Sequence, residues 1–369
     1  MAGLFFFVHC GRASRPEMTF HRGVVWLVAF LSGLSPAAAQ AIDRTQLAVV
    51  VNSQDSLSVR IGEYFVGRRR IPLRNVLRVR FPPGRSVMTR AEFGRIEAQV
   101  DAQVRPGVQA FALTWAAPYR VGCMSMTSAF AFGFDEAYCA NGCKPTRSSP
   151  YFDSRVAHPF TQLGLRPTMA IAATSFARAK ALIDRGVASD RLRPAGTAYL
   201  LSTRDRRRDV RGASYSLVER ALAGRMRVRE LAQNELRNAR DVFLYFIGGA
   251  RVGGLKTLHF IPGAVADHLT SFGGMLTDSV QMSALRWLEA GATGSYGTVV
   301  EPCNMPKKFP DPAVLARHYL NGETLIEAYW KSVRMPGQGI FIGEPLASPF
   351  GPNAAARRGN SGPGRTRER

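Results

Sequence analysis

The sequence lacks the features that mark several large classes of protein. It has no internal repeat, no coiled-coil heptads and no apolar run long enough to cross a membrane. Its two glycine-rich runs, at residues 248–254 and 291–297, lack the spacing and the lysine of a phosphate-binding loop. No basic motif interleaved with aromatic residues indicates specific nucleic-acid binding. These absences argue against solenoid, fibrous and membrane-spanning folds, and no specific nucleic-acid partner is expected.

Acidic residues are scarce. The chain has 49 Lys and Arg against 27 Asp and Glu among 369 residues, a formal charge of +22. Residues 1–39 contribute +2 and residues 351–369 contribute +4, so the remaining +16 belongs to residues 40–350. A basic surface favours an anionic partner such as an acidic polysaccharide, a membrane surface or nucleic acid. The arginine bias of a GC-rich genome would produce the same excess, so both explanations stand.

The first 39 residues have the pattern of a secretory signal peptide. Arg22 precedes an apolar run of about ten residues, too short for a membrane span, and a proline and three alanines follow it. We therefore expect cleavage after Ala39 and export to the periplasm or the extracellular space, with no membrane anchor after cleavage. The stretch before Arg22 is long for a signal peptide, which makes Met18 a candidate for the true start.

Residues 40–350 alternate between apolar strands and helices, and 46% of the chain is hydrophobic, enough for a sizeable core. Strands are expected at residues 47–52, 75–81, 108–115, 168–174, 196–203, 241–247 and 292–300. Helices are expected after the first strand, from Thr89, and at residues 175–185, 214–223, 228–237 (polar), 279–289, 312–320 and 323–333. This order predicts a single α/β domain with a mainly parallel sheet covered by helices on both faces. Residues 351–369 predict a disordered basic tail.

Four cysteines remain beyond the signal peptide, and three of them lie in the long irregular segment 116–160. An even number of cysteines in an oxidising compartment predicts two disulfides. Cys123 and Cys303 each follow a predicted strand, so both would emerge at the carboxyl edge of a parallel sheet. We therefore expect one bridge between these two and a second, local one between Cys139 and Cys143. A four-thiolate zinc site and a reactive cysteine with a histidine partner are the alternatives.

The richest polar cluster contains Asp267, His268 and Ser271. A histidine beside a carboxylate and a hydroxyl is a candidate for acid–base or nucleophilic catalysis near neutral pH. The alternative is structural: Asp267 caps a helix and His268 lies on its polar face. Glu301 and Glu344 each end a strand-like run beside a proline. We expect both to bind ligand in the crevice beside the cysteine loops, beyond the carboxyl ends of the strands, with simple turn chemistry as the alternative.

Three segments carry a resemblance to a known family. They are PYRVGCMSMTSAFAFGFDEAYCANGC (118–143), ADHLTSFGGMLTDSVQMSALRWLEAGATGSYGTVVEPC (266–303) and the stretch from GETLIEAYWKSV to GIFIGEPLASPF (322–350). From about Leu47 to Phe350 the chain resembles an uncharacterised family of exported bacterial proteins from species that carry the exosortase protein-sorting system. The resemblance implies an exported protein of unknown activity, in genomes that sort proteins to the envelope and make exopolysaccharide.

A more distant resemblance is to gingipain-type cysteine peptidases of the caspase-like fold. GATGSYGT (291–298) and Gly343-Glu344-Pro345 look like late elements of that fold. The peptidases carry a catalytic histidine in a Gly-His-Gly turn after one central strand and a cysteine after the next. Here the first position resembles Ile247-Gly248-Gly249 and the second falls near residues 267–271, so neither catalytic residue is present. The resemblance implies a caspase/gingipain-like topology without the catalytic pair.

Together these patterns predict an exported, disulfide-bonded α/β protein associated with the envelope. The first hypothesis is a non-catalytic or degenerate relative of a caspase-like-fold hydrolase, which binds an anionic exopolysaccharide or an exported protein. The alternative is an active hydrolase or peptidase whose site is built from loops 116–143, 248–279 and 301–309. We expect no metal and no cofactor.

Overall fold

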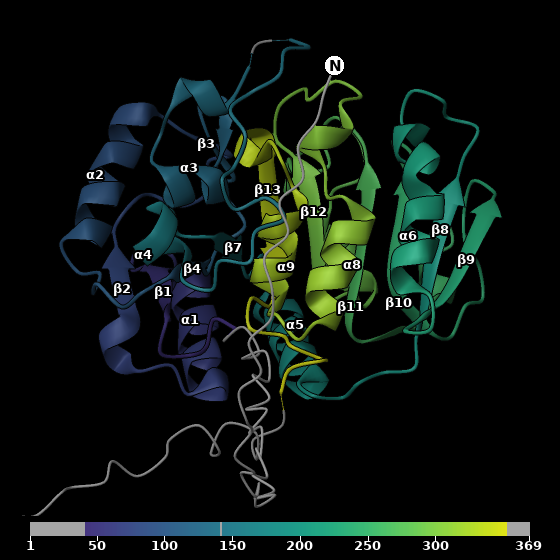
Figure 1. The fold of residues 1–369 in the computed structure, drawn as a ribbon. Coiled ribbons are helices and arrows are strands. Elements are labelled where there is room, and N and C mark those ends of the chain that lie inside the picture. The colour runs from purple at the N-terminus through teal and green to yellow at the C-terminus, as the bar shows by residue number, and fades with distance from the viewer. Residues whose placement is uncertain (1–40, 141, 353–369) are drawn as a thin grey trace, which may run out of the picture. The chain divides into compact units, whose positions relative to one another are not determined.

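The computed structural model describes residues 41–140 and 142–352 of the chain, so the predicted signal peptide and residues 353–369 of the predicted tail lie outside the described residues. A ten-stranded sheet has the strand order β2-β1-β4-β7-β13-β12-β11-β10-β8-β9 (Figure 1). Its strands are β1 (Leu47–Asn52), β2 (Val76–Val79), β4 (Ala110–Leu113), β7 (Thr168–Ala170), β8 (Thr197–Ser202), β9 (Arg227–Ala232), β10 (Val242–Gly248), β11 (Phe260–Leu269), β12 (Gly294–Thr298) and β13 (Gly339–Gly343). A small second sheet contains β3 (Val87–Met88), β5 (Arg120–Val121) and β6 (Met124–Ser125).

The large sheet is mainly parallel. β2, β1, β4 and β7 form one parallel group, and β12, β11, β10, β8 and β9 form another. Between them, β13 pairs antiparallel with β12 and meets β7 through one residue pair, Ile342 and Ala170. This strand, yellow in Figure 1, is therefore the seam between the two groups. The predicted α/β architecture with a mainly parallel sheet is confirmed.

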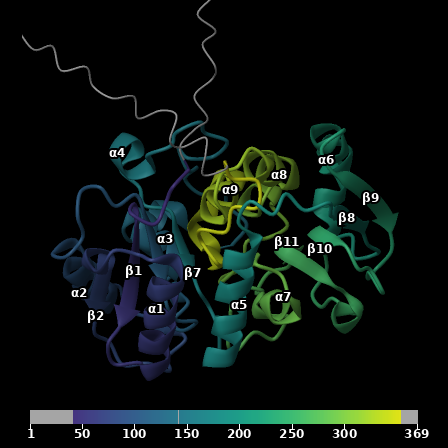
Figure 2. The same ribbon diagram turned by 90° about the horizontal axis from the view of Figure 1, so that it is seen from below.

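Helices cover both faces of the sheet. They are α1 (Ser56–Arg69), α2 (Arg90–Asp101), α3 (Met126–Phe132), α4 (Pro159–Leu163), α5 (Phe176–Ser189), α6 (Tyr215–Leu222), α7 (Leu285–Ala290), α8 (Pro312–Leu320) and α9 (Leu325–Ser332). Figure 2 shows α1, α5 and α7 on one side of the strands, and α6, α8 and α9 on the other. Every residue of β1 and β10 is buried, as expected for strands covered on both faces. None of the helices in the described part of the chain is long and apolar enough to span a membrane.

Helix starts follow local capping signals. The Asp55 carboxylate accepts a backbone hydrogen bond at the start of α1, and Thr89 and Glu92 form a capping box at the start of α2. The Ser175 hydroxyl does the same for α5. These side chains satisfy backbone N–H groups that have no partner inside the helix, so the helices begin where the sequence predicts.

Loops from the two parallel groups meet at the carboxyl edge of the sheet. The Asp278 carboxylate, in the loop after β11, accepts hydrogen bonds from Ser86 Oγ and Tyr119 OH, both at 2.6 Å. Ser86 follows β2 and Tyr119 follows β4. The disulfide between Cys143 and Cys303 links the loop after β4 to the loop after β12. The edge predicted to hold the site is therefore built by both groups of strands.

Three local predictions are wrong. The polar segment near residues 228–237 forms the edge strand β9 rather than a helix. Among the described strands it pairs with β8 alone, so polar side chains on it remain hydrated. Asp267 lies inside strand β11 and caps no helix. The helix predicted at residues 279–289 is confined to α7, because the Ser279 and Ser283 hydroxyls donate to loop carbonyls and hold the preceding residues in an irregular turn.

Candidate functional site

The site predicted from the sequence lies where β10 and β11 end. These strands are parallel neighbours, with Ile247 opposite His268 and Gly248 opposite Leu269. Just beyond them, the Gly249 N–H donates to the Leu269 carbonyl at 3.2 Å. The two chain positions that the peptidase resemblance matches to catalytic residues therefore lie side by side at the carboxyl edge.

A neighbouring loop covers the end of β10. Residues 203–209 follow β8, and we call them the covering segment. A Cβ atom added to Gly248 would lie well under 3.0 Å from the backbone carbonyl of Arg208, a distance that real Cβ atoms do not adopt. Thr203 Oγ1 also donates to the Gly248 carbonyl at 2.9 Å. The space at this position accommodates glycine and no side chain, so a histidine here would require the covering segment to move.

The side chain of Arg208 extends the cover to β11. Its Nε donates to Thr270 Oγ1 at 3.2 Å, and its guanidinium forms an ion pair with Asp205 at 2.7 Å. Thr270 Oγ1 in turn donates to Gln281 Oε1 at 2.7 Å, so the hydroxyl at the strand end is engaged. In the sequence this segment reads only as a charged turn. Its signal is Gly248 itself, because a glycine that ends an apolar strand marks a close backbone approach.

Asp267 belongs to a buried ion pair. Its carboxylate lies 2.6 Å from the guanidinium of Arg211, and the two side chains are 1% and 3% exposed. Arg211 also donates to the Ile247 carbonyl at 3.0 Å and to the Pro310 carbonyl at 3.4 Å. Burial raises the pKa of Asp267, and the Arg211 charge opposes that rise. The pair joins β10, β11 and the loop after β12 in the interior.

Both ring nitrogens of His268 are occupied. The Trp287 Nε1–H donates to Nδ1 at 2.9 Å, so Nε2 carries the proton and donates to the Met282 carbonyl at 3.0 Å. Burial lowers the pKa of His268 to about 4. The ring is therefore neutral at pH 7, and its one basic nitrogen already accepts a hydrogen bond from indole. Such a histidine has no free lone pair to offer to a substrate.

The three predicted catalytic residues do not converge. Successive residues of a strand point to opposite faces, so Asp267 faces Arg211 while His268 faces α7. Ser271 follows the end of β11, and its carbonyl accepts a hydrogen bond from Thr298 Oγ1 at 2.8 Å. Within residues 41–140 and 142–352, no hydrogen bond joins the Ser271 hydroxyl to His268. A catalytic triad needs its three side chains in one line of hydrogen bonds, and this arrangement lacks that line.

The four cysteines of the described chain form two disulfides, as predicted, but with a different pairing. Cys123 is joined to Cys139, and Cys143 to Cys303. The expected pairing is wrong because α3 lies inside the segment that the sequence marks as irregular. This helix returns the chain to Cys123 and leaves the next cysteine to reach the loop after β12. No cluster of three or more His, Cys, Asp or Glu side chains in the described part of the chain is arranged to hold a metal ion.

The two predicted binding carboxylates lie at opposite edges of the sheet. Glu301 is exposed at the carboxyl edge, where Oε1 accepts the Cys303 N–H at 2.7 Å. Glu344 follows β13, and because β13 is antiparallel to β12 it ends at the amino edge. There Glu344 is fully buried, and Arg69 donates to both carboxylate oxygens, at 2.7 and 2.5 Å. The expectation that both glutamates face one crevice is therefore wrong.

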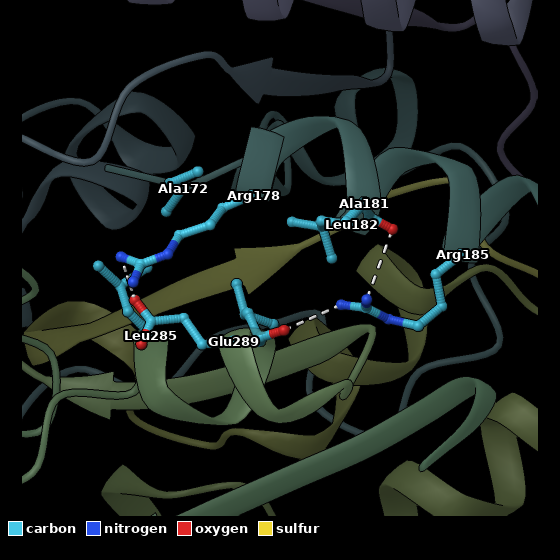
Figure 3. Close-up of a pocket in the computed structure, with 9 residues that line it drawn as sticks. Ala172, Arg178, Ala181, Leu182, Arg185, Leu285 and Glu289 are labelled. Carbon is cyan, nitrogen blue, oxygen red and sulfur yellow. Dashed lines mark hydrogen bonds and ion pairs between the residues drawn. The ribbon is translucent and has the colours of Figure 1, made fainter. Parts of the chain in front are cut away.

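A small cavity lies between α5 and α7 (Figure 3). Arg178 and Glu289 form an ion pair across it at 2.8 Å, and Arg185 donates to the carbonyls of Leu288 and Ala292 at the end of α7. Burial lowers the pKa of Arg185 to about 10. The cavity volume is about 80 Å³, which holds a few waters and is far below that of a ligand pocket. The ion pair and these hydrogen bonds link α5 to α7.

No protein-family model and no curated protein matches the sequence. Among solved structures, one of a protease matches with a TM-score of 0.42 and 11% sequence identity, over 83% of this chain and 78% of that chain. At this TM-score and identity the likeness carries no argument about activity. The α/β architecture therefore rests on the strands and helices described above.

Proposed function

We propose that this chain is an exported, envelope-associated relative of caspase-like-fold hydrolases that has no hydrolytic activity and binds an acidic polysaccharide. The observation that carries the proposal is the covering segment. The Arg208 backbone fills the space that a side chain at position 248 would need. A protein that retained hydrolysis at this edge would keep that space open for a catalytic group and a substrate.

The buried polar residues support the same proposal. His268 is neutral, and both of its ring nitrogens bind groups of the protein itself. Asp267 is committed to Arg211 in the interior. Catalytic groups must reach the reacting atoms, whereas these two groups hold strands and loops together.

The charge and the disulfides support an exported, anion-binding protein. Disulfides persist in oxidising compartments, and the described chain has two of them. The formal charge of +16 on residues 40–350 favours association with polyanions, which are abundant in polysaccharide envelopes.

The test is a paired assay on the secreted protein, expressed as the full chain. Fluorogenic peptides and chromogenic glycosides measure hydrolysis, and affinity electrophoresis in gels containing polygalacturonate measures binding, with neutral dextran as the control. We expect no turnover above the blank and retardation by polygalacturonate alone. Turnover that a Ser271→Ala variant loses would favour the alternative, a hydrolase that uses Asp267, His268 and Ser271. Equal mobility in both gels would contradict the binding role.

A further inference from the structure

A large groove lies on the α7 side of the sheet. Its volume is about 950 Å³, at the upper end of the range typical of ligand sites. The connection between β10 and β11 (residues 249–259) forms one wall and α7 forms the other. Four cations line it: Arg237, Arg251, Lys256 and Arg286. Glu289 is the one acidic residue of its lining.

Two of these cations, Arg251 and Lys256, form no ion pair within the described residues. Arg237 is paired with Glu235 at 2.7 Å and Arg286 with Glu289 at 2.9 Å. By contrast, Arg251 donates only to the Val280 carbonyl, at 2.9 Å, and Lys256 has no ion pair within the described residues. A backbone carbonyl orients the Arg251 guanidinium without neutralising it. The groove therefore presents a net positive charge with one arginine already positioned for an anionic group.

The floor of the groove is apolar. Val252, Leu258 and Met282 lie in the lining and are each 8% exposed. The lining residues within the described chain include no aromatic side chain. Single-stranded nucleic acids bind mainly by stacking their bases on aromatic side chains, so an aliphatic floor does not favour one. The aliphatic floor suits the C–H faces of sugar rings, while the cations at the rim suit their carboxylates.

The wall of the groove is fixed before any ligand arrives. Gly254 has a φ of +74°, and a Cβ atom there would overlap the Leu236 carbonyl. Thr257 Oγ1 donates to the Gly254 carbonyl at 2.7 Å and accepts the Asn238 N–H at 3.0 Å. The glycine permits a close approach, and the threonine ties the connection to the loop after β9. Binding therefore costs little ordering of the wall.

The geometry points to this groove as the binding site for a carboxylate-bearing polysaccharide, with Arg251 and Lys256 as the residues that contact its carboxylates. This inference rests on the proposed function and locates it. A concave site with its cations at the rim admits a single polymer chain and excludes a flat bilayer. Uronic acid units supply a carboxylate and an apolar ring face at each repeat, which matches a charged rim above an aliphatic floor.

The test compares a groove variant with a matched control variant. Arg251→Glu together with Lys256→Glu changes the net charge by the same amount as Arg74→Glu together with Arg80→Glu. Arg74 and Arg80 are exposed beside β2, and no ion pair within the described residues includes them. Polygalacturonate oligomers are titrated into each secreted protein by calorimetry, and far-UV circular dichroism checks that each variant is folded.

We expect the groove variant to weaken binding at least about tenfold and the control variant to weaken it by less than about twofold. Equal weakening by both variants would assign the affinity to overall charge and overturn the site, while leaving the proposed function intact. Unchanged binding by the groove variant would also overturn the site. No binding by the unmodified protein would contradict the site and the function together. Tighter binding of oligothymidylate than of polygalacturonate would overturn the ligand class.

Discussion

Lowering the pH should destabilise the fold through His268. In the native state the ring is buried and neutral, and burial lowers its pKa from 6.5 to about 4. Between these two values the unfolded chain binds a proton that the native chain excludes, so stability is lost as the pH falls from 6.5 toward 4. Each unit of pKa difference corresponds to about 1.4 kcal/mol. At pH 4.5 the expected loss from this residue is therefore about 2.5 kcal/mol.

The measurement must isolate His268 from other buried groups. Burial raises the pKa of Glu327 from 4.5 to about 7, with Glu323 adding to the rise. Its contribution has the opposite sign, because stability from this group falls as the pH rises from 4.5 to 7. A His268→Gln variant removes only the histidine. We therefore compare the free energies of unfolding of the parent and the variant in guanidinium chloride at pH 7.0 and pH 4.5.

The variant is expected to be less stable than the parent at pH 7.0, because a flexible amide replaces a rigid ring that packs against Trp287 and makes two hydrogen bonds. At pH 4.5 that deficit should shrink by about 2.5 kcal/mol, since the parent alone carries the cost of excluding the proton. A deficit that is the same at both pH values would refute the reasoning. It would mean that His268 is accessible enough to titrate in the native state as it does in the unfolded chain.

Two further predictions concern the same strands. Gly248→Ala should cost about 1–3 kcal/mol in the free energy of unfolding, because the added Cβ overlaps the covering segment. At Gly249 the atom nearest to an added Cβ lies 3.4 Å away, so Gly249→Ala should cost much less. Equal losses of stability in denaturant titrations would show that the covering segment does not restrict position 248. Asp267→Asn should cost about 3–5 kcal/mol by leaving Arg211 charged, buried and unpaired, while the Arg211→Met, Asp267→Leu double variant should cost less. A double variant less stable than the single one would contradict that account.

The strands buried on both faces were predictable because each is one continuous apolar run. LAVVVN gives β1 and VFLYFIG gives β10, and every residue in both is buried. Helices cover both faces of a parallel sheet of this kind, so its central strands have no solvent-exposed side and are apolar throughout.

Strand β11 was missed because its stabilising contacts are not local. Its sequence contains Pro262, Gly263 and the Asp267-His268 pair, a pattern that favours a turn or a helix start. The strand tolerates the two polar residues because Arg211 pairs with one and Trp287 with the other. Those partners come from different elements, so the sequence around β11 does not predict them.

The sequence predicts which loops approach one another at the candidate site, but not what fills the space between them. The sequence predicted a site that includes loop 248–279, which contains the Gly-Gly turn after β10 and the polar cluster, and the structure brings the ends of β10 and β11 together. The occupancy of the space between them depends on residues 203–209, which the sequence shows only as a charged turn. The position of Glu344 depended on the direction of β13, which a five-residue apolar segment does not reveal.

The bridge from Cys143 to Cys303 has a consequence for the reduced chain. It closes a loop with a sequence separation of 160 residues. In the chain-entropy model this lowers the conformational entropy of the unfolded state and so stabilises the fold by roughly 5 kcal/mol. That amount is comparable with the whole stability of many domains. A chain kept reduced lacks this contribution, and among the described strands β13 alone then joins the two groups within the sheet. Oxidation therefore adds a contribution to stability comparable with that of a whole domain, so the reduced chain should be much easier to unfold than the oxidised one.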